Sequence, residues 1–466
     1  MPEPMTIGAR SVRGTGTFDV VDPATGRVFD TAPCCGPDDL DAAVSAAYDA
    51  WPGWRASADQ RSAVLAAAAD TVAATVDDLA ALLTAEQGKP IGEARTELVR
   101  AADRLRHAAA LRVTARLLRD DGTDRVEVRW RPVGPVAAIA PWNFPVQLGV
   151  AKIAPALAAG NPVVLKPSPY TPLTTLALGR LLAGVLPPGV LNVVSGPEPL
   201  GDRLVSHPGI RQVTFTGSVA TGRRVAAATA PRLVPSTLEL GGNDAAIVLP
   251  DADVDDIADA LFWSAFGNCG QICMAVKRVY VAASRHDELV EALAERARTV
   301  VVGAGTDPGT RIGPLATAPQ YRRVTELVAA AQANGARAAA GGAPIGGDGY
   351  FHAPTVLTGV TDTDRIVAEE QFGPALPVLA YDTVEEAVAR ANDTRYGLCG
   401  SVWGTDTDRA AEIAGRLEVG TAWVNRHLAL AFDDPFAGTK DSGLGVAGGE
   451  WGLYAHTEPF VLHRPS

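Results

Sequence analysis

Two cysteines stand four residues apart in the segment FGNCGQICMA, which covers residues 266–275. A thiolate is a strong nucleophile, so either Cys269 or Cys273 could attack an electrophilic carbon and form a covalent intermediate. The five cysteines form no C-x-x-C pair and suggest neither a zinc site nor a disulfide framework, so we predict no metal site. The segment alone does not decide which thiol reacts, or with what.

Two further polar residues could serve a nucleophilic thiol. Asn143, in APWNFPVQ, follows an apolar strand, and a buried amide there can donate to an oxyanion; a turn asparagine is the ordinary alternative. Glu239, in LELGGND, ends an apolar stretch before two glycines. Partial desolvation would raise its pKa toward that of a working base, whereas bonding to backbone N–H groups is the alternative.

Three other segments have features of a nucleotide site. VVLKPSPYTP places Lys166 at a strand end before prolines that prevent a helix, so this lysine can bind ribose or phosphate or lie at the surface. FTGSVATG leads from a strand to a helix start at Ser218, where backbone N–H groups suit a pyrophosphate, although G-x-G-x-x-G is absent. EEQFGP, residues 369–374, predicts an acidic loop that carries Phe372.

These polar residues follow the strands of a repeating strand–helix pattern. VGPVAAIAP, NPVVLKPS and GVLNVVSG alternate with helical segments, which predicts a parallel, doubly wound sheet with ligands at the strand carboxyl ends. A second α/β block begins at NDAAIVL and runs to about residue 440. The tail EPFVLHRPS is extended and has no core of its own, so we expect it to pair outside its domain, for instance on another subunit.

Composition limits the class of protein. A chain of 466 residues is too long for one core and predicts at least two domains. With 47% hydrophobic and 20% charged residues, the chain is packed and globular, and the net charge of −12 argues against nucleic acid or an anionic membrane as a partner. The N-terminus lacks an apolar signal segment, and no apolar run reaches the roughly 18 residues of a membrane span, so we expect a cytoplasmic protein.

Taken in order, the motifs resemble those of the aldehyde dehydrogenase superfamily along nearly the whole chain. They are PWNFP, KPS-x-x-TP, FTGS-x-x-TG, ELGG, F-x-N-x-GQ-x-C, EE-x-FGP, WVN, PF-x-G-x-K-x-SG and GL-x-x-x-T-E. The separation of 34 residues between Glu239 and Cys273 also matches. So many motifs in one order outweigh the ordinary alternative for each of them.

The resemblance implies oxidation of an aldehyde to its acid. Cys273 would be the nucleophile, and the oxyanion of the thiohemiacetal would be stabilised by the Asn143 amide and the Cys273 N–H. Glu239 would activate the water that hydrolyses the thioester, and Glu450 would relay protons from it. Cys269 falls at a variable position of the motif, so we expect it to pack beneath the loop.

The resemblance also implies NAD or NADP as cofactor. Lys166 would bond the adenosine ribose, Ser218 and Trp142 would meet the pyrophosphate, Glu370 would bond the nicotinamide ribose, and Phe372 would pack near the nicotinamide. The whole implied set is Trp142, Lys166, Ser168, Gly217, Ser218, Gly241, Glu370 and Phe372.

The implied architecture has two doubly wound α/β domains and a small β oligomerisation arm. A Rossmann-like cofactor domain would comprise residues 1–111 and 134–241, and a catalytic domain residues 242–441. The arm would combine residues 112–133 with the C-terminal segment 442–466. Members of the family usually form homodimers or homotetramers, so the resemblance implies one of these. It also implies a small-molecule aldehyde as the binding partner.

Two departures from the family pattern bear on specificity. Pro169 stands where many NAD-specific members have a glutamate that repels a 2′-phosphate, so NADP should be tolerated and could be preferred. Ala151 and Gly267 stand where bulky aromatics often occur, and Leu428 and Leu430 replace frequent Asp and Phe residues, which predicts a sizeable, largely apolar aldehyde. The implied pocket residues are Phe144, Leu148, Ala151, Gly267, Leu428, Leu430 and Phe436.

Several alternatives stay open at this point. Arg426 and His427 follow WVN, and Arg426 could meet a substrate carboxylate as in semialdehyde dehydrogenases, although a solvent-facing pair is the favoured interpretation. A CoA-acylating aldehyde dehydrogenase generally lacks the glutamate at position 239. A non-catalytic scaffold of the same fold would not need to retain Cys273 and Asn143.

Overall fold

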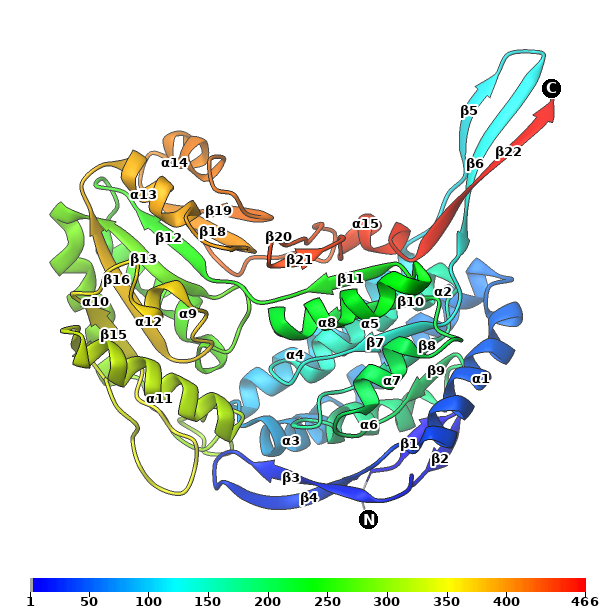
Figure 1. Cartoon of the computed structure of the whole chain (residues 1–466), viewed down its shortest axis with the longest axis horizontal. Helices are drawn as coiled ribbons and strands as arrows, with labels where there is room; N and C mark the ends of the chain where they lie inside the picture. Colours follow the sequence, from blue (N-terminus) through cyan, green and yellow to red (C-terminus); the bar gives the residue numbers. More distant parts are fainter. Residues whose placement is uncertain (1–2) are drawn as a thin grey trace.

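The computed structural model describes residues 3–466, which form two α/β bodies side by side with a narrow β arm projecting from one of them (Figure 1). The first body is organised by an eight-stranded sheet whose five central strands, β9 to β11, are parallel. Across this sheet the strands are β2 (Arg10–Val12), β1 (Met5–Ile7), β9 (Leu191–Val193), β8 (Val163–Lys166), β7 (Val136–Ile139), β10 (Gln212–Thr216), β11 (Ser236–Glu239) and β21 (Gly443–Leu444).

Eight helices cover this first sheet and complete its core. They are α1 (Pro37–Trp54), α2 (Ala58–Ala74), α3 (Val76–Gln87), α4 (Ile91–Ala110), α5 (Pro145–Ala159), α6 (Leu173–Leu182), α7 (Leu200–Ser206) and α8 (Val219–Thr229), with a hairpin of β3 (Thr17–Asp22) and β4 (Arg27–Pro33) beside them. Helix α5 begins with Pro145, whose fixed φ suits the first turn, and ends at Gly160 with a φ of 101°. Its side chains are apolar almost all round, as expected of a buried helix.

The second body contains a seven-stranded sheet with six parallel strands, from β15 to β19. The strands in order are β14 (Arg337–Ala340), β15 (Thr355–Thr358), β16 (Ala375–Tyr381), β13 (Val276–Ala282), β12 (Asp244–Val248), β18 (Cys399–Trp403) and β19 (Thr421–Val424). The helices of this body are α9 (Val254–Phe266), α10 (His286–Thr299), α11 (Ala318–Ala333), α12 (Arg365–Ala368), α13 (Val384–Asn392) and α14 (Thr407–Ala414). The predicted fold class, two doubly wound α/β bodies, is confirmed.

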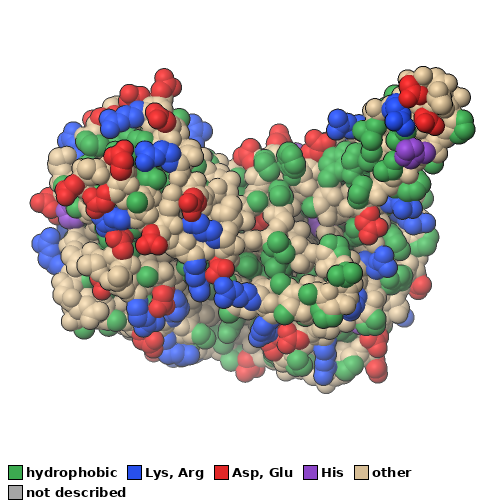
Figure 2. Space-filling model, turned by 45° about the horizontal axis from the view of Figure 1, so that its top comes forward, with side chains coloured by type: hydrophobic (Ala, Val, Ile, Leu, Met, Phe, Trp, Pro, Cys, Tyr) green, Lys and Arg blue, Asp and Glu red, His purple; other side chains and the backbone are tan. Residues whose placement is uncertain are grey.

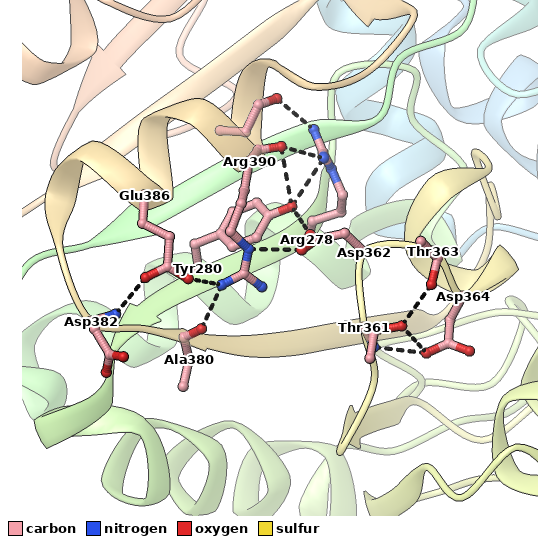
Figure 3. A network of polar contacts seen from close by, with 11 residues as sticks. Arg278, Tyr280, Thr361, Asp362, Thr363, Asp364, Ala380, Asp382, Glu386 and Arg390 are labelled. Atoms are coloured by element: carbon pink, nitrogen blue, oxygen red, sulfur yellow. Dashed lines mark hydrogen bonds and ion pairs between the residues drawn. The ribbon is translucent and has the colours of Figure 1, made fainter.

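A polar network anchors the loop before α12 in the second body (Figure 3). The Tyr280 hydroxyl donates to Asp362 at 2.7 Å, and Arg390 donates to the other oxygen of the same carboxylate at 2.7 Å. Arg278 is buried and donates to the Tyr280 hydroxyl at 3.2 Å. The network therefore ties β13 and α13 to the segment that continues into the loop with Glu370.

The projecting arm is a three-stranded antiparallel sheet of β5 (Arg116–Asp120), β6 (Asp124–Pro132) and β22 (Thr457–Pro465). The C-terminal strand pairs with β6 of its own chain along its whole length, so another subunit is not needed to pair it. Leu117, Leu118 and Val461 are exposed on this arm, and Figure 2 shows hydrophobic side chains where the arm leaves the body.

Two separate hydrophobic cores lie on either side of residues 241–244. This supports the predicted division into residues 1–111 with 134–241 and residues 242–441, which we keep as a proposal. The remaining short elements are β17 (Tyr396–Gly397), β20 (Thr439–Lys440) and α15 (Gly449–Tyr454). Within residues 3–466, no helix combines the length and apolar character that crossing a membrane requires.

Candidate active site

The segment with both cysteines connects α9 to β13 through an unusual backbone. Asn268, Cys269 and Gly270 follow one another in the left-handed region, with φ values of 49°, 56° and 71°. A non-glycine residue there costs of order 1–2 kcal/mol, so the surrounding structure must impose this conformation. Position 270 requires glycine, because a Cβ would lie 2.3 Å from the carbonyl oxygen of Gly373.

Buried hydrogen bonds hold this loop in place. Lys277, 1% exposed, donates from Nζ to the Gly270 carbonyl. The Gln271 side chain donates to the Asn268 carbonyl at 3.0 Å and accepts from the Ala316 N–H at 2.9 Å. These contacts satisfy the polar groups of a buried turn and fix the residues that follow it. The sequence analysis missed Lys277, although a lysine among the apolar residues of VKRVYVA was a visible signal.

The structure distinguishes the two thiols. Cys269 is 2% exposed and packs in the core of the second body, where burial strongly raises its pKa. Cys273 lines two cavities that meet at this residue. Burial raises the pKa of Cys273 to about 12, with Glu370 and other acids adding to the increase. The resting group is therefore a protonated thiol, which needs a base before it can attack.

Two N–H groups beside Cys273 are free to donate to an oxyanion. Asn143 is buried, and its side-chain nitrogen donates to the Gln271 carbonyl at 2.8 Å. A side-chain amide has two donors, so one N–H of Asn143 is left for a ligand. The backbone N–H of Cys273 has no acceptor within the part of the chain that the structure describes.

A buried ion pair fixes the backbone of Asn143. Lys89 Nζ lies 2.6 Å from Glu97, both side chains are fully buried, and the same ammonium donates to the Asn143 carbonyl at 2.9 Å. The second oxygen of Glu97 accepts from the N–H groups of Val146 at 2.9 Å and Gln147 at 3.1 Å, in the first turn of α5. The pair therefore joins α4 to the oxyanion donor. Sequence analysis missed it, although Glu97 lies on the apolar face of α4.

Glu239 ends β11 and faces Lys152, which lies on α5. Neither carboxylate oxygen of Glu239 has a hydrogen-bond partner among residues 3–466, so bonding to backbone N–H groups, the alternative considered from sequence, does not occur. Burial raises the pKa of Glu239, and the Lys152 charge opposes that increase. Burial also lowers the pKa of Lys152, which Glu239 opposes in turn. A desolvated carboxylate beside a cation is suited to accept a proton.

The larger of the two cavities, about 410 Å³ in volume, suits a dinucleotide. Ser218 accepts from the Thr221 N–H at 3.2 Å and so begins α8, whose N-terminus suits an anion. Glu370 accepts from the Gly242 N–H at 3.1 Å, and a Cβ on Gly241 would lie 2.2 Å from its other oxygen. The cavity brings together these predicted cofactor residues: Trp142, Gly217, Ser218, Gly241, Glu370 and Phe372.

The other two predicted cofactor residues lie outside that cavity. Lys166 ends β8, and both it and Ser168 are buried. Burial lowers the pKa of Lys166, and the nearby carboxylate of Glu198 opposes that change. An acid that the sequence analysis did not consider therefore lies near Lys166.

The second cavity, about 110 Å³, is the candidate aldehyde site. Of the predicted pocket residues, it is lined by Leu148, Ala151, Leu430 and Phe436. Three others, Phe144, Gly267 and Leu428, line neither cavity. Phe144 instead packs against Lys89, whose Nζ lies 3.9 Å from the ring centroid, and Gly267 ends α9 beside the side chain of Ile272.

Three more predicted residues lie away from the site or have another role. Glu450 is exposed at the start of α15 and lines neither cavity, so the structure does not bring it to Glu239. Arg426 is exposed, as the favoured interpretation expected. His427, by contrast, is buried. Its ring nitrogens bond Ser401 Oγ at 2.9 Å and the Met274 carbonyl at 2.8 Å.

Comparisons with known proteins agree on one family. Residues 11–460 match the model of the aldehyde dehydrogenase family. A Sinorhizobium fredii protein named probable succinate-semialdehyde dehydrogenase [NADP(+)] is 39% identical over 97% of this chain and 92% of its own length. A Streptomyces coelicolor protein named 3,6-anhydro-alpha-L-galactose dehydrogenase is 41% identical over 94% and 91%. The NAD+ complex of a Bacillus cereus aldehyde dehydrogenase, 34% identical, superposes with a TM-score of 0.97 over 100% of this chain and 97% of that one.

The buried ion pair yields a stability prediction. In Glu97→Gln, the ammonium of Lys89 stays buried without its counter-ion, which should lower the free energy of unfolding by about 3–5 kcal/mol. Because the same lysine holds Asn143, kcat should also fall. Urea unfolding and steady-state kinetics measure both. The control is Asp103→Asn on the same helix, whose exposed pair with Arg106 contributes at most about 1 kcal/mol. Equal stability of the two variants would contradict the role of Glu97.

The Glu239–Lys152 pair yields a pH prediction. Because the Lys152 charge lowers the pKa of Glu239, Lys152→Met should raise that pKa further. A base must be deprotonated to act, so activity is lost as the pH falls through its pKa. The acid limb of the profile of kcat/KM against pH should therefore move to higher pH in the variant. Lys440→Met, at an exposed site, should leave it in place. An unmoved limb in Lys152→Met would mean that the two charges are not coupled.

Proposed function

The chain belongs to the aldehyde dehydrogenase family and is an NAD(P)-dependent enzyme of that family, and from this premise we propose that it oxidises a sizeable, largely apolar aldehyde to its carboxylic acid. The observation that carries the proposal is Cys273, which lines both the dinucleotide cavity and the apolar cavity. A reacting carbon bound to its sulfur would lie between a hydride acceptor on one side and room for a side chain on the other.

The first step is attack by the thiol. Glu239 takes the proton of Cys273, the sulfur bonds to the aldehyde carbon, and the carbonyl oxygen becomes an oxyanion. The free N–H of Asn143 and the N–H of Cys273 are the two donors for that oxygen. Each such donor typically contributes about 3–4 kcal/mol to the stability of the transition state.

The second half of the reaction forms a thioester and then hydrolyses it. When bound, the nicotinamide supplies the hydride acceptor, which makes the net change a two-electron oxidation. Glu239 releases to solvent the proton that it took from Cys273 and then removes a proton from water. The hydroxide attacks the thioester carbon, and the carbon–sulfur bond breaks to release the acid and the Cys273 thiolate. Because neither oxygen of Glu239 has a partner among the described residues, the carboxylate is free to bind that water. This favours hydrolysis over transfer of the acyl group to CoA.

The cofactor would be held by residues of the first body and by the loop with Glu370. Lys166 and Glu370 would bond the two riboses, and Ser218 would receive the pyrophosphate at the start of α8. Pro169 removes the acid that excludes NADP in many family members, whereas Glu198 places another acid near Lys166. We propose that both cofactors bind, with the acid at position 198 limiting the preference for NADP.

The lining of the second cavity supports the size and character of the substrate. Leu148, Leu430 and Phe436 are apolar, and Ala151 leaves room beside them. The two relatives named above carry different substrates in their names, a semialdehyde and an anhydro sugar, so the names alone do not choose between them. A semialdehyde is the second candidate, although the exposed Arg426 is poorly placed to bind its carboxylate.

We also propose a homodimer or homotetramer. The arm carries exposed Leu117, Leu118 and Val461, and exposed apolar side chains on a projecting sheet are suited to a contact between copies.

The experiment for this proposal is an aldehyde panel with NAD and with NADP, in which reduced cofactor is read by absorbance. Because the cavity is apolar and sizeable, kcat/KM should be higher for octanal or an aryl aldehyde than for acetaldehyde. The acid should form at the same rate with and without CoA. A higher value for acetaldehyde would refute the substrate size, a preference for NAD above about 100-fold would refute tolerance of NADP, and no turnover of any aldehyde would refute the whole proposal.

A further inference from the structure

Arg104 lines the aldehyde cavity from α4, the helix that also carries Glu97. One face of this helix, with Arg100, Arg104 and His107, packs against the loop around residues 427–434. Arg100 donates to the Leu430 carbonyl at 3.3 Å, and His107 lies 3.3 Å from Asp433. The guanidinium of Arg104 stacks on Phe432, 4.9 Å from the ring centroid.

Arg104 differs from Arg100 and His107 because its guanidinium has neither a hydrogen bond nor an ion pair among residues 3–466. Its Nε is buried without a hydrogen-bond partner, and no carboxylate among residues 3–466 lies within ion-pair distance of it. Arg106, on the same helix, pairs with Asp70 and Asp103 at the surface. Arg104 is partly buried, and a partly buried charge without a partner is costly, so natural proteins rarely keep one without a function.

The other ionisable groups of the cavity do not pair with the Arg104 guanidinium. Glu239 is balanced by Lys152, and the Asp434 carboxylate accepts from the Ala431 N–H at 2.8 Å within the loop. His456 is neutral near pH 7, because burial lowers its pKa to about 4. Burial also lowers the pKa of Arg104 to about 10, so its guanidinium is still a cation at neutral pH. Asp434 carries a negative charge in the same cavity, but no carboxylate among residues 3–466 lies within ion-pair distance of Arg104, so its guanidinium stays available to an anionic ligand.

We propose that Arg104 binds a carboxylate on the substrate, so that the aldehyde is an oxo acid with an apolar chain between its two ends. The proposal rests on the function proposed above and specifies its substrate class. The aldehyde carbon would lie at Cys273, the chain would pack on Leu148 and Leu430, and the carboxylate would accept hydrogen bonds from the Arg104 guanidinium. A guanidinium presents a planar fork of donors that matches a carboxylate. The product would be a dicarboxylic acid.

This assignment explains two observations together. The leucines and Phe436 of the lining favour a carbon chain, and a guanidinium without a partner favours one terminal anion rather than a neutral sugar. It also places the anion site on α4 rather than on the segment after WVN, where Arg426 is exposed. This role was not predictable from sequence, because α4 carries three other arginines and only packing shows which one faces the cavity.

The test compares oxo acids of about four to eight carbons with alkanals of the same length, as kcat/KM with saturating cofactor. The wild-type enzyme should prefer the acid at its best length by at least about tenfold. Arg104→Gln should lower kcat/KM for that acid by about 100-fold, mainly through KM, and should affect the alkanal much less. Arg104→Lys should recover part of the loss. The matched control, Arg106→Gln, removes a surface arginine of the same helix and should leave kcat/KM unchanged for both substrates.

A second readout does not depend on turnover. The dicarboxylate product should protect Cys273 from alkylation by iodoacetamide in the wild-type enzyme, and this protection should be lost in Arg104→Gln while a monocarboxylate protects neither. Thermal unfolding checks that the variant is folded. Equal kcat/KM for acids and alkanals in the wild-type enzyme, or equal losses for both in a folded Arg104→Gln, would overturn the proposal. Those results differ from failure of the proposed function itself, which is no turnover of any aldehyde.

Discussion

The buried ion pair of Lys89 and Glu97 is the interaction on which the geometry of the site depends. One ammonium holds the carbonyl of Asn143, and one carboxylate holds the first turn of α5. The helix that begins there carries Lys152, so the oxyanion donor and the cation beside Glu239 are placed by the same pair. Burying two charges is expensive, and the hydrogen bonds to the Asn143 carbonyl and from the N–H groups of Val146 and Gln147 offset part of this cost.

Desolvation gives the site its chemical character. Cys273, Glu239 and Glu370 are acids whose pKa values burial raises, and Lys152 and Lys277 are cations whose pKa values it lowers. Proton transfer among such groups is easy because none of them is held strongly in its charged form. The resting thiol is therefore protonated, and a base must take its proton before it can attack.

The sequence predicted the fold and the strand-end residues because their positions follow from local pattern. Glu239 and Lys166 end parallel strands, and parallel strands place their carboxyl ends at one edge. Lys152 and Arg104 were missed because helices bring them to the site, and a helix periodicity does not say what a charged side chain will meet. Lys89 was missed because it lies in the loop between α3 and α4, where no pattern predicts its partner. The lone lysine in the apolar α5 was an available signal, as was Lys277. The predicted solvent exposure of His427 was wrong for a related reason, because the local sequence does not show what a loop residue will pack against.

The central claim is that Cys273 carries the acyl group and Glu239 releases it. Mass spectrometry of Glu239→Gln, quenched in acid after mixing with an aldehyde and oxidised cofactor, tests this most directly. The predicted result is a covalent adduct with the mass of the aldehyde minus two hydrogens, located on Cys273 by fragmentation and formed only when the cofactor is present. It should form more slowly than in the wild-type enzyme, because the base that takes the thiol proton is missing, and then persist, because the thioester is not hydrolysed. An adduct on Cys269, or consumption of aldehyde with no adduct on either thiol, would contradict the account.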